Sequence, residues 1–443
     1  MSTKKLLFLL FFTAFFIRLA TLVGILYYYP NEQFKETLRS LDAETYNIEG
    51  RNIARYWHGI SKNKDKVFSH YSYFNAIVFY LFGFHPIVPQ VINCFLGAIT
   101  VIFIYLVAKV IFDQKIAILS SVFYSFFPSL VFWSTKNLKE ASYLFSVVVI
   151  IWFVIKLQQG HKKINVAYYL LSTILLLYLR FMKIHIFLFL SYAIITSFII
   201  NIERKMIYQR IFNTLFFIIV VSIIGGSFLN YRFIPRPSLI IKDSAMERSE
   251  DSEIDRTEIS SRISAGTHRQ NNFNEMRKLS ASFCRKISFI FAAIDRSRKN
   301  SSKVGDSVFM PETDISTPIK ALKFLPFGMI HFLFAPFPWK AEGFLQKITI
   351  PEMLLWYSMI PFILYGLFYS IRFELKKIFC IFFYITMTTL LYSLALPNIG
   401  TIYRIRASIF PFCFMFASVG IIHFSHYICK RSESMRRKAC DRG

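Results

Sequence analysis

Residues 88–133 read VPQVINCFLGAITVIFIYLVAKVIFDQKIAILSSVFYSFFPSLVFW, and this stretch decides the class of the fold. Two apolar runs, Val88–Phe112 and Ile116–Trp133, are separated only by the polar residues Asp113–Lys115. A helix needs about 20 apolar residues to cross the hydrocarbon of a bilayer. Each run is close to that length, so the stretch predicts two membrane-crossing helices that reverse direction at the polar link.

The rest of the chain has the same character. Hydrophobic residues make up 55% of the 443 residues and charged residues only 18%, against about 25% in a typical soluble domain. A water-soluble globule could not bury this much apolar surface, and a disordered chain would carry far less of it. The composition therefore predicts an all-α polytopic membrane protein.

The net charge of +26 would suggest a nucleic-acid partner in a soluble protein. Here the cations cluster beside the apolar runs, as the positive-inside rule requires, so no nucleic acid is expected. The six cysteines are scattered without a CxxC pair, and no disulfide framework is expected. No glycine-rich phosphate loop is present, so a nucleotide-binding domain is not expected; if the protein is a transferase, its donor arrives through the membrane.

About ten apolar runs have the length of a transmembrane helix or nearly so. They are Leu6–Tyr29, Val88–Phe112, Ile116–Trp133, Ala141–Leu157, Ile164–Leu179, Ile184–Ile202, Ile211–Leu229, Pro351–Ile371, Ile378–Leu396 and Ala407–Ile428. Two shorter runs, Tyr71–Phe84 and Phe324–Trp339, are predicted to be interfacial or re-entrant helices. The first run follows Lys4-Lys5 and lacks a cleavage site, so it is interpreted as a retained anchor.

Charge favours ten spans over twelve. With ten, both termini are cytoplasmic, and so are the basic clusters Lys162-Lys163, Arg204-Lys205 and Arg436–Lys438. If the two short runs also crossed the membrane, the basic clusters Lys162-Lys163 and Arg204-Lys205 would face outward. Ten spans place most chemically useful residues in outer connections, above all in 30–70 and 230–350.

The chain is accordingly divided into three regions. Residues 1–229 form an N-terminal transmembrane region with a catalytic outer loop at 30–70. Residues 230–350 form a large outer, periplasmic region, and residues 351–443 a C-terminal transmembrane region with a basic cytoplasmic tail. Within the second region, apolar residues recur at helical spacing from Phe273 to Ile294. They predict an amphipathic helix that lies either on the membrane or against the protein's own outer face.

The outer loop contains Leu41-Asp42-Ala43-Glu44-Thr45-Tyr46, followed by Tyr56 and Trp57. The pattern predicts an interfacial helix that begins at Asp42, a good N-cap residue. Asp42 either only caps this helix or is a carboxylate held at the membrane surface, where it takes a proton from a hydroxyl group.

A set of short motifs follows this loop in order. They are Asp42-x-x-x-Tyr46, Asn93-x-x-x-Gly97-x-x-x-Val101-x-x-x-Tyr105, Phe127-Pro128-Ser129-x-x-x-Trp133-Ser134, Asn137-Leu138-Lys139-Glu140, Ala335-Pro336-Phe337-Pro338-Trp339 and Asn398-x-Gly400-Thr401-x-x-Arg404-x-Arg406. Their order and spacing over most of the chain resemble the GT-C glycosyltransferases of family 39. That family includes the protein O-mannosyltransferases and the lipid A aminoarabinose transferases.

The resemblance implies a polyprenyl-phosphate-linked sugar as donor, transfer on the outer face of a bacterial cytoplasmic membrane, and a lipid, glycan or protein as acceptor. It implies Asp42 as the general base on the acceptor and Glu140 as an acid that helps to hold substrate or metal. Asp42 and Glu140 would be the ligands of a divalent metal ion, and Glu44 and Tyr46 would contact the acceptor or the sugar. No nucleotide cofactor is implied.

The chemistry of this reaction needs cations where the departing lipid phosphate gains negative charge. Arg404, Arg406, Arg180 and Lys183 lie at the outer ends of predicted spans, and Arg18 lies in the middle of the first. Each is a candidate phosphate ligand. The alternative for the outer four is snorkelling to lipid headgroups, and Arg18 alternatively pairs inside the bundle.

Two other functions fit the same composition. An O-antigen polymerase or ligase would use a polyprenyl-diphosphate glycan, and a lipid-glycan flippase would catalyse no covalent step. The Asp42-x-x-x-Tyr46 motif favours the glycosyltransferase over the first. The scarcity of mid-span charges and of internal repeats argues against the second.

Overall fold

The computed structural model describes residues 2–28, 41–61, 69–159, 166–201, 207–229, 288–303, 307–341 and 344–440. Regular structure in these ranges is helical, with one isolated β-bridge between Val308 and Asn398. The labelled α-helices are α1 (Thr3–Tyr28), α3 (Leu41–Trp57), α4 (Tyr71–Phe82), α5 (Ile87–Ile111), α6 (Gln114–Phe126), α7 (Pro128–Ser134), α8 (Glu140–Gln159), α9 (Val166–Met182), α10 (Ile184–Ile200), α11 (Ile207–Leu229), α13 (Pro318–Phe334), α14 (Phe344–Ala395), α15 (Ile399–Arg406) and α16 (Phe410–Cys440).

The prediction of an all-helical polytopic membrane protein is confirmed. Six helices in the described residues are long and apolar enough to cross a membrane, or seven if the bent pair α6 and α7 counts as one span. All ten predicted runs coincide with helices over most of their described length, but α9 and α10 are shorter apolar helices. Two of the runs lie within α14, which leaves helical geometry at Glu374. The structure therefore supports six to seven spans by length and composition.

Local sequence explains where several helices begin and end. Asp113 caps α6, because its side chain accepts a hydrogen bond of 2.8 Å from the amide of Ile116. Pro128 at the first position of α7 separates it from α6, and the two axes differ by 59°. Lys183 is extended between α9 and α10, so these two helices are joined by a single-residue break.

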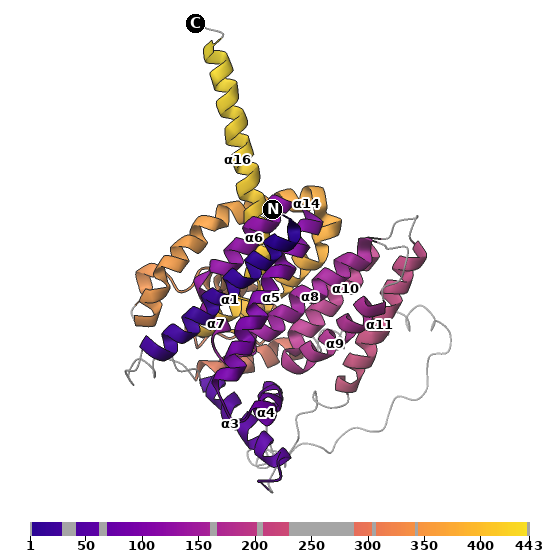
Figure 1. The fold of residues 1–443 in the computed structure, drawn as a ribbon, viewed down its shortest axis with the longest axis vertical. Coiled ribbons are helices and arrows are strands. Elements are labelled where there is room, and N and C mark those ends of the chain that lie inside the picture. The colour runs from indigo at the N-terminus through magenta and orange to yellow at the C-terminus, as the bar shows by residue number, and fades with distance from the viewer. Residues whose placement is uncertain are drawn as a thin grey trace, which may run out of the picture.

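The bundle is held together by apolar packing around α5, which contacts α1, α6 and α8, and by the pairing of α14 with α16. The second pair packs closely because Gly366 and Gly420 face each other's helix. A Cβ atom on Gly366 would lie 1.9 Å from the carbonyl oxygen of Phe416, so a larger residue would force the helices apart. Both chain ends lie at one end of the bundle, and α3 and α4 lie at the other (Figure 1).

The predicted amphipathic helix is described only from residue 288 onward, and the acidic segment Asp243–Glu258 lies outside the described residues. Residues 288–302 are helical and pack on the protein itself. Asp295 accepts a hydrogen bond of 2.9 Å from the amide of Ile315. The buried Arg298 donates to the carbonyl oxygens of Phe309 and Met310. In this part of the helix, Asp295 and Arg298 contact the protein itself, whereas Phe289 and Ile290 are about half exposed.

Candidate active site

Two predicted acids and one predicted arginine meet at the end of the bundle that carries α3 and α4. Asp42 lies in the first turn of α3, Glu140 begins α8, and Arg404 lies in α15. Arg404 Nη1 lies 2.8 Å from Asp42 Oδ2, and Arg404 Nε lies 3.4 Å from Glu140 Oε1. The guanidinium group therefore bridges two carboxylates that are far apart in the sequence.

Lys183 completes this cluster from the break between α9 and α10. Its Nζ lies 3.9 Å from Glu140 Oε1 and 4.1 Å from the centre of the Tyr143 ring. Burial lowers the pKa of Lys183 to about 7, although the charge of Glu140 opposes this shift. Lys183 is thus a cation that loses its proton near neutral pH.

The two acids differ in exposure. The Asp42 side chain is 48% exposed and that of Glu140 only 7%. Burial alone would lower the pKa of Arg404, but the charges of Glu140 and Asp42 outweigh it and raise that pKa above its ordinary value. Arg404 therefore stays charged. Asp42 is open to a molecule that arrives from solvent, whereas Glu140 is held between two cations.

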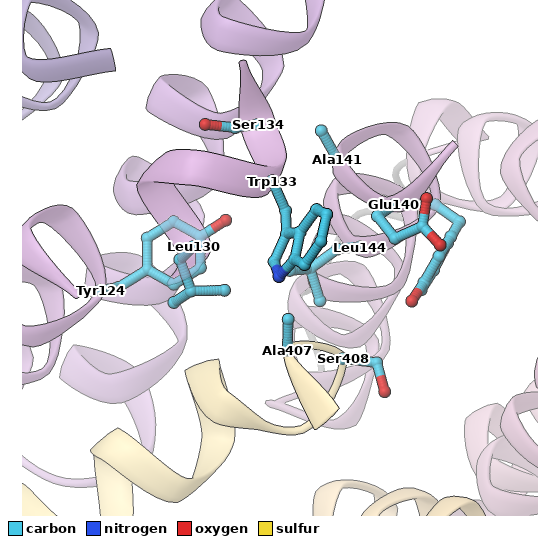
Figure 2. Close-up of a pocket in the computed structure, with 10 residues that line it drawn as sticks. Tyr124, Leu130, Trp133, Ser134, Glu140, Ala141, Leu144, Ala407 and Ser408 are labelled. Atoms are coloured by element: carbon cyan, nitrogen blue, oxygen red, sulfur yellow. The ribbon is translucent and has the colours of Figure 1, made fainter. Parts of the chain in front are cut away.

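A pocket adjoins the buried acid. Figure 2 shows its lining, in which Trp133 of α7 stands beside Glu140 and Leu144 of α8. The other lining residues are Tyr124, Leu130, Ser134, Ala141, Tyr143, Ala407 and Ser408. Trp133 Nε1 and Glu140 Oε2 are buried and have no hydrogen-bond partner within the described ranges. A ligand that both donates and accepts hydrogen bonds could satisfy them.

Asn93 and Asn137, which belong to the motifs that resemble the GT-C family, help to hold this end of the bundle together. The Asn93 side chain donates hydrogen bonds of 2.9 Å to the carbonyl oxygens of Lys136 and Leu138. The Tyr71 hydroxyl donates to Asn137 Oδ1 at 3.2 Å. Asn137 Nδ2 in turn donates to the Asn47 side chain of α3 at 2.6 Å. These bonds fix the segment before Glu140 against α3, α4 and α5.

Arg406 does not join Arg404, contrary to the sequence-based prediction. α15 is a helix, in which residues two apart point to nearly opposite sides because each residue turns the chain by about 100°. Arg406 is fully buried and donates hydrogen bonds of 2.8 Å to the carbonyl oxygens of Leu333 and Ala335. Its surroundings are those of a residue that holds the end of α13.

The other two predicted phosphate ligands also lie apart from the acid pair. Arg18 is fully buried in α1 and donates to the carbonyl oxygen of Ala14 at 3.0 Å. Its guanidinium carbon lies 5.4 Å from the centre of the Tyr124 ring, on the far wall of the pocket. The Arg180 guanidinium carbon lies 5.5 Å from the centre of the Phe181 ring. Within the described residues, the ion pairs of Asp42 and Glu140 are with Arg404 and Lys183, not with Arg18 or Arg180.

Glu44 and Tyr46, which are predicted to contact the acceptor substrate or the sugar, lie on the same helix as Asp42. Tyr46 is buried against Tyr71, with ring centres 5.1 Å apart, and Glu44 is half-buried. Lys139, to which the sequence analysis gave no role, lies with its Nζ 5.8 Å from the centre of the Tyr46 ring. Its charge also acts on Glu140 and Lys183. Its position directly before Glu140 in the motif Asn137-Leu138-Lys139-Glu140 is the feature of the sequence that could have indicated a role in the site.

Asp42 and Glu140 do not make a metal site as they stand. The Arg404 guanidinium lies between their carboxylates, where a metal ion would have to bind. The described part of the chain also brings no group of three or more His, Cys, Asp or Glu side chains together. The charge of the two acids is balanced by Arg404 and Lys183.

Comparisons with known proteins agree with the motif resemblance. Residues 70–225 match the family described as dolichyl-phosphate-mannose-protein mannosyltransferase. No curated protein sequence matches the chain. The fold is similar to that of the archaeal oligosaccharyltransferase AglB from Archaeoglobus fulgidus, solved with an inhibitory peptide and a dolichol-phosphate. The TM-score is 0.50 at 12% identity, and the match covers 98% of this chain and 52% of AglB.

The chain thus spans about half the length of AglB, and at this identity the likeness concerns the fold alone. The family match covers α4 to α11 and includes Asn93, Asn137, Glu140 and Lys183. It confirms the resemblance to GT-C enzymes. Through residues 70–225, the chain is therefore similar to the dolichyl-phosphate-mannose-protein mannosyltransferase family of membrane glycosyltransferases.

Proposed function

We propose that the protein transfers a sugar from a polyprenyl-phosphate carrier to a lipid, glycan or protein acceptor on the outer face of a bacterial cytoplasmic membrane. The family supports the donor class. The observation that carries the proposal is the bridge from Arg404 to both Asp42 and Glu140. It joins an exposed carboxylate, which suits an acceptor hydroxyl, to a cation that suits a phosphate.

Transfer is a direct displacement at the anomeric carbon of the sugar. The acceptor oxygen forms the new bond to this carbon while the bond from the carbon to the phosphate oxygen breaks. Asp42 takes the proton of the acceptor hydroxyl. The phosphate leaves with both electrons of the broken bond, and Arg404 and Lys183 stabilise the added negative charge. Glu140 keeps these two cations in place.

The outer location is supported by the distribution of charge. The end of the bundle that carries α3 and α4 is opposite the end with Lys4, Lys5 and the basic C-terminal part of α16 (Figure 1). Positive residues beside membrane spans favour the cytoplasmic side. With ten crossings, both termini are cytoplasmic and the candidate active site is outside.

The test compares envelope glycans, lipids and proteins by mass spectrometry in cells that express the wild type, Asp42→Asn or no protein. The wild type should add a sugar mass to one acceptor class, and Asp42→Asn should remove it while the protein stays folded and in the membrane. Asp314→Asn is the matched control, because Asp314 pairs with Lys320 away from the cluster. Full transfer by Asp42→Asn would refute the base assignment.

A further inference from the structure

The buried carboxylate of Glu352 lies outside the predicted site and connects helices that border the site. Glu352, near the start of α14, is only 4% exposed. Its Oε2 accepts a hydrogen bond of 2.7 Å from the backbone amide of Ser129 and another of 2.7 Å from the hydroxyl of Tyr403. Ser129 belongs to α7 and Tyr403 to α15. One oxygen atom thus links three helices.

Both hydrogen-bond partners of Glu352 are close to working parts of the site. Tyr403 directly precedes Arg404, which bridges the two acids. Trp133, at the other end of α7 from Ser129, lines the pocket beside Glu140. The rings of Trp133 and Tyr403 contact each other edge to face, with centres 6.4 Å apart. Glu352 thus connects α15, which carries Arg404, to α7, which forms a wall of the pocket.

Packing alone does not explain an acid at this position. A buried carboxylate is costly, and apolar residues usually join helices at a lower cost in free energy. Glu352 Oε1 has no hydrogen-bond partner among the placed residues, so the cost is met in part by the two hydrogen bonds to Oε2 and by the charge of the buried Arg406. What a carboxylate offers is an oxygen that accepts from a hydroxyl and an amide at once, which no apolar side chain can do.

We propose that Glu352 is a positioning residue for Arg404. Through the Tyr403 hydroxyl it fixes the rotation of α15, so that Arg404 points to the place where the donor phosphate binds. Glu352 itself touches neither substrate. This inference rests on the proposed function, because it assumes that Arg404 is a phosphate ligand.

The test measures binding of polyprenyl phosphate to the full-length protein in nanodiscs. Tyr403→Phe removes one hydroxyl group and should weaken binding about five- to ten-fold, the usual effect of losing such a buried hydrogen bond. Glu352→Ala should weaken it at least as much. Glu352→Gln should restore near wild-type affinity, because the amide oxygen can accept both hydrogen bonds. Tyr169→Phe is the control, since it removes a hydroxyl that is bonded to Asn213 away from the site.

A double-mutant cycle separates positioning from a general loss of stability. In an Arg404→Gln background, Tyr403→Phe should cause no further loss of affinity, because the residue through which it acts is gone. Additive losses, or wild-type affinity of Tyr403→Phe alone, would overturn this inference and leave the proposed function intact. A wild-type protein that does not bind polyprenyl phosphate would overturn the proposed donor and this inference together.

Discussion

Asp42 and Arg404 form an ion pair of 2.8 Å across the candidate active site. In the proposed reaction, the same two groups have separate tasks: Asp42 takes a proton and Arg404 binds a phosphate. In the structure each offsets the charge of the other. A donor phosphate must therefore compete with Asp42 for the guanidinium group, and donor binding would release the carboxylate for its role as a base.

This competition predicts an unusual phenotype for Asp42→Asn. Transfer should be lost, yet the affinity for polyprenyl phosphate should rise by about two- to five-fold, because a partly exposed ion pair is worth about 0.2–1 kcal/mol. Removing the negative charge of Asp42 also removes its repulsion of the phosphate. Equilibrium binding to the protein in nanodiscs measures the change.

Asp314→Asn is the control for this measurement, because it breaks an ion pair with Lys320 and changes the net charge equally. Its affinity should equal that of the wild type. Unchanged or weaker binding by Asp42→Asn would show that Asp42 and the phosphate do not share Arg404.

Lys183 predicts a pH dependence of donor binding. Because burial lowers its pKa to about 7, the side chain is charged below that pH and neutral above it. The charged groups that act on it are Glu140, Lys139, Arg404 and Asp42. The cationic form attracts phosphate, so the affinity for a polyprenyl-phosphate sugar, a diester whose own charge is constant here, should fall as the pH rises through about 7.

Lys183→Arg isolates this effect, because arginine keeps its charge throughout the range. Its binding should vary little between about pH 6 and 8, and Lys183→Met should bind weakly at every pH in that range. The same pH profile in the wild type and in Lys183→Arg would assign the titration to another group.

The sequence predicts most where one physical requirement, such as the apolar length of a membrane span, applies to a continuous stretch of residues. Apolar length alone located the helices, because a membrane span must satisfy its own backbone hydrogen bonds. It did not fix the number of crossings, because α14 covers two predicted runs and α9 and α10 are short. Asp42 and Glu140 were indicated by the motif resemblance, and Arg404 and Lys183 by their place at the outer ends of apolar runs.

Side-chain direction and long-range partners were harder to predict. Arg406 was grouped with Arg404 because the stretch was interpreted as a loop, whereas its helical geometry turns the two side chains apart. The contacts of Glu352 cannot be predicted from the sequence, because its partners Ser129 and Tyr403 lie far away along the chain. Only the folded bundle brings these three residues together.

The ten-span topology predicts which parts of the protein face outward. Arg55 is exposed on α3, and Cys429 is exposed on α16 at the opposite end of the bundle. In a variant with Cys284, Cys429 and Cys440 replaced, a cysteine introduced by Arg55→Cys should react with a membrane-impermeant maleimide in intact spheroplasts.

Cys429, kept as the single accessible cysteine of a second variant, should react only after the membrane is opened. Labelling of Cys429 in sealed cells, with protection of the Arg55→Cys site, would place the site on the cytoplasmic side. Cys94, Cys380 and Cys413 are buried and serve as an internal background.

Arg406 predicts a loss of stability without a direct effect on the donor. Its guanidinium group is fully buried, donates to the carbonyl oxygens of Leu333 and Ala335, and contacts Met353 Sδ at 3.1 Å. Arg406→Met keeps the length of the side chain but leaves these carbonyl groups without their donor, which should cost about 3 kcal/mol and lower the Tm of the detergent-solubilised protein by several degrees. The folded fraction should bind polyprenyl phosphate with an affinity near that of the wild type, because Arg404, on the other side of α15, remains in place. Arg404→Met should bind weakly, and it should also lower the Tm, because it leaves the buried Glu140 with only Lys183 as a counter-ion. If the Arg406→Met protein had a normal Tm but bound the phosphate poorly, Arg406 would be assigned a direct role in donor binding.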